Sequence, residues 1–160
     1  MKSVLIVMGS ASDAEALKPC ARNLEKFGIP YKVRVASAHR SPDSAALIAK
    51  TAKADGYGVI IAAAGMAAHL GGVLAAHTTL PVIGIPMKSA VLDGIDALLA
   101  TVMMPSGVPV ATVAINGAAN AAILAAEMLA IADDELADKL AAYKRELNEK
   151  TVAADAAIEL

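Results

Sequence analysis

Aromatic residues and cysteine are scarce in this sequence. Its 160 residues include no tryptophan, one phenylalanine and three tyrosines, and Cys20 is the single cysteine. One cysteine cannot form an internal disulfide, and Cys20 falls in a helical pattern, so we expect a buried thiol rather than a reactive one. Flavin needs aromatic rings to stack on, which the candidate ligand-binding loops lack. The sequence therefore argues against a flavin-binding protein.

Charge clusters and the common nucleotide motifs are also missing. The net charge is −2, and no basic cluster is interleaved with aromatic residues, so we expect no nucleic-acid partner. Cys, His and carboxylate residues do not recur at metal-ligand spacing, so we expect no metal. The sequence lacks G-x-x-x-x-G-K-[ST] and G-x-G-x-x-G, and neither ATP nor a dinucleotide is expected as a cofactor.

One uncharged run, from Val59 to Ala76, has 18 residues, close to the roughly 20 that a membrane crossing needs. Three glycines and His69 interrupt it, and it divides into a β-branched half and an alanine-rich half. We therefore predict a strand followed by a loop and a helix, with no membrane partner. The apolar run in MKSVLIVMGS is too short for a signal peptide, so we expect a cytoplasmic protein.

Alanine and small aliphatic residues are abundant. Hydrophobic residues make up 57% of the chain, and the mean hydropathy is +0.56. Such a chain has more apolar surface than one small domain buries, so we expect an obligate homo-oligomer. We interpret residues 1–160 as a single domain, with an α/β core over 1–132 and a C-terminal helical extension over 133–160.

Short apolar runs alternate with longer helical patterns along the chain. Because these runs are mostly continuous rather than alternating, they are typical of parallel strands covered by helices on both faces. We predict an α/β fold, a three-layer α/β/α sandwich around a five-stranded parallel sheet. The strands are expected near residues 3–8, 31–36, 58–64, 80–85 and 109–115.

Helix starts carry recognisable signals. Ser12 with Glu15 fits a capping box, and Ser41 places a hydroxyl before a first-turn proline, so helices should begin near residues 13 and 42. Pro19 lies inside the first of these helices, where it removes a hydrogen bond. The mixed-charge pattern from 133 to 160 predicts a helix that packs on a neighbour, with a solvated tail as the alternative.

Ligands of parallel α/β sheets bind outside the carboxyl ends of the strands, so the loops after the first three strands are candidates. The first loop offers backbone N–H groups and hydroxyls at a helix start, suited to a phosphate, with a carboxylate for a ribose hydroxyl. Ordinary N-capping explains the same residues almost as well. The candidates here are Gly9, Ser10, Ser12 and Asp13.

The second and third loops carry histidines. Ser37, Ala38, His39 and Arg40 combine a group that titrates near neutrality with a permanently charged guanidinium, which suits proton transfer on an anionic substrate. A surface histidine bonded to turn backbone is the alternative. In the third loop, glycines and alanines leave room for a ligand beside His69, although a histidine satisfied within the core is the alternative. The third-loop candidates are Gly65, Ala67, Ala68, His69 and Leu70, whereas His77 lies away from this edge and is interpreted as structural.

Six strings, in order and at matching spacing over nearly the whole chain, resemble the PurE family: MGSASD, SAHRSPD, AAAGMAAHLGG, LPVIGIP, MPSGVPVATVAI and GAANAAILAAEML. The resemblance implies a homo-octamer of flavodoxin-like subunits that act on an imidazole ribonucleotide without metal or cofactor. It implies that His39 moves protons. It also implies that ribose and phosphate are held by Ser10, Ser12, Asp13, Ser37 and Arg40.

The third loop distinguishes two branches of that family. The AAHL string at residues 67–70 resembles the mutase branch, which moves a carboxylate from the exocyclic nitrogen to C4 of an aminoimidazole ribonucleotide in purine biosynthesis. The small side chains of this loop suit retention of carbon dioxide between the two steps. The carboxylase branch, which uses free carbon dioxide, is the alternative, and a flavodoxin-like ligand-binding protein is the non-enzymatic one.

The chain also departs from the PurE pattern. In the PurE family, glycine is frequent at the position of Met66, proline at that of Gly71 and glutamine at that of Met103. The loop at residues 115–117 looks shorter than in many members of the family. We expect these departures to affect the shape of the pocket more than its chemistry.

Overall fold

The computed structural model describes residues 1–159 and places the predicted strands and helices in alternation. The strands are β1 Ser3–Met8, β2 Tyr31–Val35, β3 Tyr57–Gly65, β4 Val82–Met87 and β5 Ala111–Thr112. The helices are the short 3-10 turn η1 Ala11–Asp13, α1 Ala14–Phe27, α2 Pro42–Ala52, α3 Leu70–Ala76, α4 Ile95–Val102, α5 Ala118–Ala130 and α6 Asp134–Ala156. Leu160, the last residue of the predicted C-terminal helical segment, lies outside the described residues.

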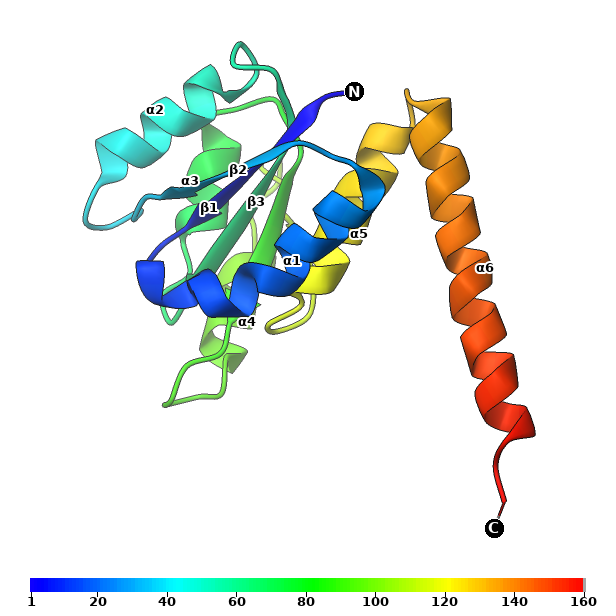
Figure 1. Cartoon of the computed structure of the whole chain (residues 1–160). Helices are drawn as coiled ribbons and strands as arrows, with labels where there is room; N and C mark the ends of the chain where they lie inside the picture. Colours follow the sequence, from blue (N-terminus) through cyan, green and yellow to red (C-terminus); the bar gives the residue numbers. More distant parts are fainter. Residues whose placement is uncertain (160) are drawn as a thin grey trace.

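The five strands form one parallel sheet in the order β2-β1-β3-β4-β5, which is the flavodoxin-like order (Figure 1). Alternate residues of each strand face opposite sides, so two apolar clusters form. One cluster packs the sheet against α1, α5 and the start of α6, and the other packs it against α2 and α3. The predicted three-layer α/β/α sandwich is therefore confirmed.

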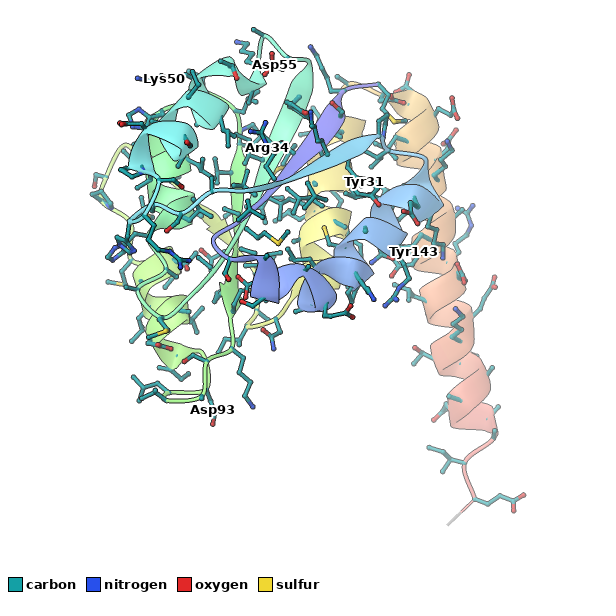
Figure 2. The ribbon with its side chains drawn as sticks, turned by 60° about the vertical axis from the view of Figure 1, so that its left-hand side comes forward. Tyr31, Arg34, Lys50, Asp55, Asp93 and Tyr143 are labelled. Carbon is teal, nitrogen blue, oxygen red and sulfur yellow. The ribbon has the colours of Figure 1, made fainter. Side chains whose placement is uncertain are left out.

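Two edge strands differ from their prediction. In β2, Lys32 to Val35 are exposed, so helices do not cover this strand on both faces, and Arg34 lies on the open edge (Figure 2). The fifth strand is reduced to Ala111–Thr112 because Pro109 has no N–H and the backbone turns at Asn116, whose φ is +56°. The pattern places strands correctly but overestimates how far the last one pairs.

The expected capping bonds also differ, although α1 and α2 begin where predicted. Ser12 does not cap α1; its hydroxyl donates to Ser10 Oγ at 2.8 Å, and Asp13 stands at the N-cap of α1 without a side-chain capping bond. The Ser41 hydroxyl accepts from the Ser37 N–H at 2.9 Å instead of capping α2. Each serine hydroxyl bonds within its own loop and so stabilises the loop instead of the helix start.

Two further predictions concern α1 and the uncharged run. Pro19 lies within α1, which continues through it to Phe27. Cys20 is fully buried, and burial raises the pKa of its thiol to about 12, as expected for an unreactive cysteine.

The uncharged run from 59 to 76 divides into most of β3 and helix α3, as predicted. Among residues 1–159, no helix combines the length and apolar composition that a membrane crossing requires.

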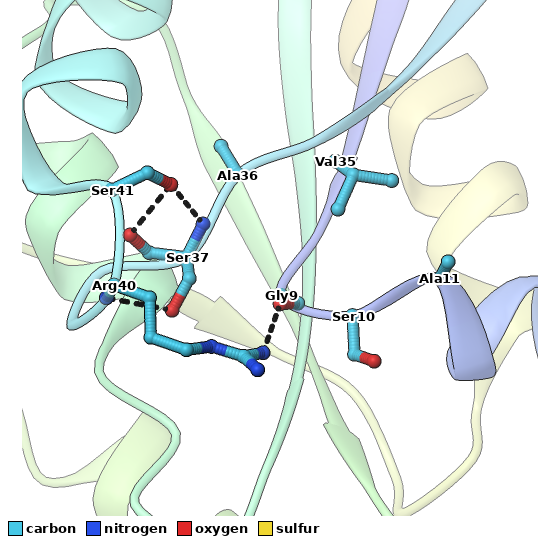
Figure 3. A pocket seen from close by; sticks show the side chains of 8 residues that line it. All are labelled: Gly9, Ser10, Ala11, Val35, Ala36, Ser37, Arg40 and Ser41. Carbon is cyan, nitrogen blue, oxygen red and sulfur yellow. Dashed lines mark hydrogen bonds between the residues drawn. The ribbon is translucent and has the colours of Figure 1, made fainter.

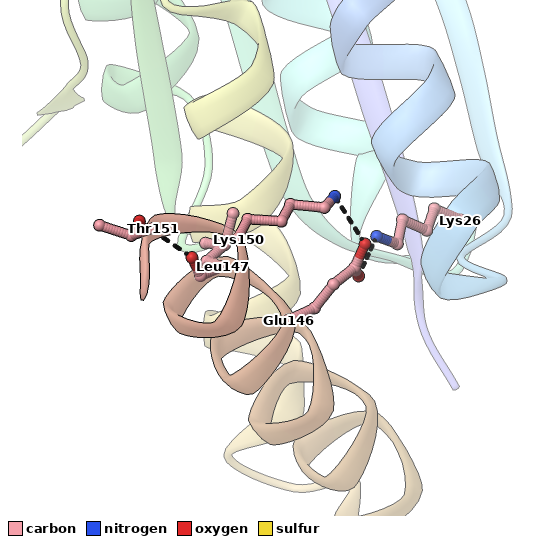
Figure 4. A network of polar contacts seen from close by, with 5 residues as sticks. All are labelled: Lys26, Glu146, Leu147, Lys150 and Thr151. Atoms are coloured by element: carbon pink, nitrogen blue, oxygen red, sulfur yellow. Dashed lines mark hydrogen bonds and ion pairs between the residues drawn. The ribbon is translucent and has the colours of Figure 1, made fainter. Parts of the chain in front are cut away.

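The buried side chains of helix α6, Leu136 and Leu140, lie near its start; the helix contacts α1 as far as Glu146 and then extends away from the domain (Figure 1). Tyr143 meets Phe27 edge to face, with ring centroids 5.5 Å apart, and the Lys26 ammonium lies 4.6 Å from the Tyr143 ring. Glu146 then accepts hydrogen bonds from Lys26 and Lys150, each at 2.8 Å (Figure 4). These are the contacts that join α6 to α1.

The ion pairs of Glu146 predict a pH dependence. Lys150 and Lys26 lower the pKa of the Glu146 carboxyl from 4.5 to about 2, so the ionised form is favoured in the folded protein. A lowered carboxyl pKa contributes stability above about pH 4.5, and this contribution is lost as the pH falls toward 2.

Glu146→Gln should therefore lower the melting temperature slightly at pH 7, since the pair is exposed, and the difference from the wild type should shrink below pH 4.5. Thermal unfolding followed by circular dichroism checks this. Glu149→Gln is the matched control, because Glu149 has no ion pair within residues 1–159. Equal losses in both variants would contradict the assignment.

Candidate functional site

A cavity of about 540 Å³ lies at the carboxyl ends of β1, β3 and β4. Helix α1 leaves β1 toward one face and α3 leaves β3 toward the other, so their loops diverge at this point, as at the switch point of other open α/β sheets. The walls contain most of the residues predicted from the three loops, namely Gly9, Ser10, Ser12, Asp13, Ser37, Ala38, His39, Arg40, Gly65, Ala67 and Leu70.

The first two loops form a polar wall. The guanidinium of Arg40 donates to the Gly9 carbonyl at 3.3 Å and so joins them, and the Ser37 hydroxyl accepts from the Arg40 N–H at 3.1 Å (Figure 3). A smaller hollow of about 350 Å³ lies beside the cavity and shares Gly9, Ser10, Ser37 and Arg40 with it. Hydroxyls, backbone N–H groups and a guanidinium in this arrangement suit a phosphate group.

The third loop forms an apolar wall. Ala67 and Leu70 line the cavity, while Ala68, only 1% exposed, lies buried beneath it and does not line it. Met66 has a φ of +55°, a left-handed conformation that costs a non-glycine residue roughly 1–2 kcal/mol. Its side chain is 62% exposed at the wall of the cavity. Met66, noted as a departure from the family pattern, therefore does shape this opening.

The two predicted site histidines meet across the gap between the second and third loops. His39 Nε2 lies 2.9 Å from His69 Nδ1, and the rings are edge to face with centroids 5.0 Å apart. His39 lines the cavity, whereas His69 does not. His69 therefore reaches the site only through His39 in this structure.

A fourth loop, which sequence reasoning missed, completes the wall. Met87 ends β4, Lys88 and Ser89 follow it, and all three line the cavity. The Asn116 side-chain oxygen accepts from the Lys88 N–H at 2.9 Å, and the Lys88 ammonium lies 3.2 Å from the Asp93 carboxylate. The same strand-end rule that selected the other three loops applies to β4 and could have found these residues.

Other polar clusters lie outside this site. His77 ends α3 and lines a separate hollow of about 460 Å³ with Lys50 and Lys53. Figure 2 shows Lys50 at the opposite end of the molecule from Asp93, which follows β4 near the cavity. Within residues 1–159, no group of three or more His, Cys, Asp and Glu side chains is placed to hold a metal ion.

Within residues 1–159, Asp13 is the one acidic side chain in the cavity wall. Partial burial raises the pKa of its carboxyl above the usual 3.8, and a backbone hydrogen bond with Ser10 opposes the shift in part. Because the pKa of Asp13 is higher in the folded than in the unfolded protein, the ionised carboxylate lowers stability at neutral pH. This cost disappears below pH 3.8, where the carboxyl is protonated in both the folded and the unfolded protein. A carboxylate kept at such a cost is typical of a ligand-binding group.

Asp13→Asn should therefore raise the melting temperature at pH 7 and weaken binding of the imidazole ribonucleotide that the PurE resemblance implies, because the amide is neutral but is a poorer acceptor for a ribose hydroxyl. Thermal unfolding and isothermal titration measure the two effects. Asp43→Asn serves as the control, since Asp43 is exposed in the first turn of α2 and its loss should lower stability slightly. A fall in stability for Asp13→Asn would refute the assignment.

Comparisons with known proteins agree with this geometry. The model of the AIR carboxylase family matches residues 3–150. The N5-carboxyaminoimidazole ribonucleotide mutase of Pyrococcus horikoshii is 52% identical over 145 residues, which are 91% of this chain and 82% of that protein. The chloroplastic phosphoribosylaminoimidazole carboxylase of Vigna aconitifolia is 49% identical over 143 residues, which are 89% of this chain but 26% of the plant protein.

A solved structure matches as well. The crystal structure of Treponema denticola PurE superposes with a TM-score of 0.89 and 31% identity, and the match covers 98% of each chain. The order of the strands, the place of the cavity and the sequence matches all lead to one assignment. As the resemblance to PurE predicts, the chain belongs to the AIR carboxylase family.

Proposed function

We propose that this enzyme is a mutase of de novo purine biosynthesis that acts in the cytoplasm. It converts N5-carboxyaminoimidazole ribonucleotide to 4-carboxy-5-aminoimidazole ribonucleotide. The observation that carries the proposal is the position of His39 between a polar wall and an apolar wall of one cavity. The activity agrees with the name of the Pyrococcus horikoshii relative.

The polar wall binds the ribose and the phosphate. Arg40 and the hydroxyls of Ser10 and Ser37 face the smaller hollow, where a phosphate group finds charged and neutral donors together. Ser12 and Asp13 line the larger cavity and suit the ribose hydroxyls. This division leaves the imidazole ring beside the apolar wall.

His39 transfers the proton in both halves of the reaction. Protonated His39 donates to the carbamate nitrogen, the N–C bond breaks with its electron pair remaining on nitrogen, and carbon dioxide leaves. Carbon C4 then forms a bond to carbon dioxide, and neutral His39 removes the C4 proton while the C–H electron pair returns to the ring. One general acid and base therefore serves twice.

The apolar wall retains carbon dioxide between the two steps. Ala64, Ala67 and Leu70 present no hydrogen-bonding side chain, and a small apolar molecule fits beside them. Apolar side chains offer water no hydrogen-bond partner beside the carbon dioxide, which limits loss of the intermediate. Ala68 supports this wall from below rather than lining it.

A carboxylase that uses free carbon dioxide is the alternative, because the Vigna aconitifolia relative is named a phosphoribosylaminoimidazole carboxylase. The test compares turnover of synthetic N5-carboxyaminoimidazole ribonucleotide with turnover of aminoimidazole ribonucleotide plus bicarbonate. A mutase consumes the first at low bicarbonate. Turnover of only the second would assign the carboxylase activity instead.

His39→Asn should reduce turnover by about 100- to 10,000-fold, because asparagine retains polarity but cannot gain and lose a proton near neutral pH. Substrate binding should change little, since the phosphate and ribose contacts lie on other residues. Single-turnover conversion and a binding titration measure the two properties. His77→Asn, a change of the same kind away from the cavity, is the control. A loss confined to binding would remove His39 from the chemistry.

The proposed assembly is a homo-octamer, as the family resemblance implies. Its support is the apolar surface that one chain leaves uncovered, including Val91 at 79% and Met103 at 76% exposure. Around α4 this surface consists of Val91, Leu92, Ile95, Leu99, Val102 and Met103. The far half of α6 exposes Leu147 and Val152 in the same way. Such surfaces are typical of subunit interfaces.

Light scattering at micromolar concentration should therefore give a mass about eight times the 16.2 kDa of one chain. Leu99→Asp should reduce that mass without changing the circular dichroism spectrum, because a carboxylate is costly to bury at an apolar interface. Glu127→Asp, a conservative change on α5, is the control. A stable wild-type mass near 16.2 kDa would contradict the assembly.

A further inference from the structure

The hydrogen bond between His39 and His69 has a direction, and we infer that His69 is a positioning residue which holds His39 in one tautomer. In this arrangement His39 keeps a proton on Nε2 and donates it to His69 Nδ1, which leaves His39 Nδ1 to exchange protons with the substrate. The inference rests on the proposed role of His39. It assigns to His69 a function that does not require contact with the substrate.

The geometry requires a single donor. The two facing nitrogens are 2.9 Å apart, so one must carry hydrogen and the other must offer a lone pair. Within residues 1–159, His39 Nδ1 has no hydrogen-bond partner. His39 therefore has one ring nitrogen engaged by His69 and one that is open to a ligand.

The chemistry selects which ring donates. The second half-reaction needs a lone pair on His39 to accept the C4 proton. If His69 donated, the only lone pair of neutral His39 would lie on Nε2 and be occupied by that bond, and no base would remain. If His39 donates, Nδ1 gains and loses the proton while the Nε2–H bond to His69 stays unchanged throughout. An acceptor behind a catalytic histidine fixes its tautomer in the same way elsewhere.

The backbone that carries each ring is held by hydrogen bonds or by buried neighbouring residues. This distinguishes the pair from a chance contact between two surface side chains. The Ser37 hydroxyl accepts from the His39 N–H at 3.3 Å, and the Ser41 hydroxyl accepts from the Ser37 N–H. His69 lies between Ala68 and Leu70, which are 1% and 2% exposed. Its side chain stands at the N-cap of α3 but makes no capping hydrogen bond there.

Charged neighbours do not compete for either ring. The other charged side chains in the cavity wall are Asp13, Arg40 and Lys88. Arg40 donates to the Gly9 carbonyl, and Lys88 pairs with Asp93. Within residues 1–159, no hydrogen bond or ion pair joins any of these groups to His39 or His69.

A pair of substitutions at His69 tests the inference. Asparagine places an oxygen near the position of Nδ1 and can still accept from His39 Nε2–H, whereas leucine cannot. His69→Leu should lower kcat by at least roughly 10- to 100-fold, the range found when the hydrogen-bond partner behind a metal-bound histidine is lost, with KM nearly unchanged. His69→Asn should retain most of kcat. His77→Leu, at the other end of α3, is the control and should match the wild type.

Nitrogen NMR gives a readout that is independent of turnover. The chain has only three histidines, so ring-labelled protein gives few signals, and His77 serves as an internal reference. At a pH where His39 is neutral, the wild type and His69→Asn should show a protonated Nε2 and a bare Nδ1 at His39. In His69→Leu the two nitrogens should become averaged between tautomers.

The outcomes separate this inference from the proposed function. If His69→Asn loses as much kcat as His69→Leu, or if His39 carries its proton on Nδ1 in the wild type, the inference is wrong even though the mutase assignment stands. If His69→Leu keeps wild-type kcat, the inference about His69 is wrong as well. If the wild type converts no carbamate substrate, the proposed function fails, while the spectra still report whether His69 sets the tautomer.

Discussion

The parallel pairing of β1 with β3 is the interaction on which the rest of the structure depends. The two strands run in register from Val4 opposite Val59 to Met8 opposite Ala63, and the Gly9 N–H then donates to the Ala63 carbonyl at 3.0 Å. Beyond this last bond the chains separate toward opposite faces of the sheet. The hydrogen bonds between β1 and β3 therefore hold together the middle of the sheet, and the cavity lies where these bonds end.

Small side chains let the helices approach this sheet closely. Five alanines of α5 are fully buried against it, and a Cβ at Gly84 would lie 2.4 Å from Thr101 Cγ2 of α4. The core is thus filled mainly by aliphatic residues and alanines, and Phe27 is the one buried aromatic ring within residues 1–159. Because alanine covers little area, a high apolar content does not produce a thick core, and apolar surface remains outside.

Local pattern was sufficient to predict the strands, the helix starts and the edge of the sheet that carries the site. It could not predict the environment of β2, because strand order, and not the sequence of Tyr31–Val35, makes β2 an edge strand. It also could not assign the hydroxyls of Ser12 and Ser41, since each has a helix N–H and a loop partner within reach along the chain. In both cases three-dimensional neighbours decided the outcome.

The candidate site was predictable to the extent that its residues follow strand ends. Lys88 and Ser89 were missed because the first residues after β4 include neither histidine nor glycine. The contact between His39 and His69 joins residues 30 positions apart and depends on the direction of both side chains, which spacing does not define. Ala68 was predicted to face the cavity, but its neighbours turn it into the core.

Burial of the only cysteine has a practical consequence. The Cys20 thiol is inaccessible, and burial raises its pKa to about 12, so it should react with thiol reagents only when α1 leaves the sheet. A cysteine introduced on an exposed position of α6 would then be the one reactive thiol of the folded chain. The native protein therefore needs no cysteine removed before a single probe is attached to it. Modification of Cys20 itself would report unfolding of the core around it.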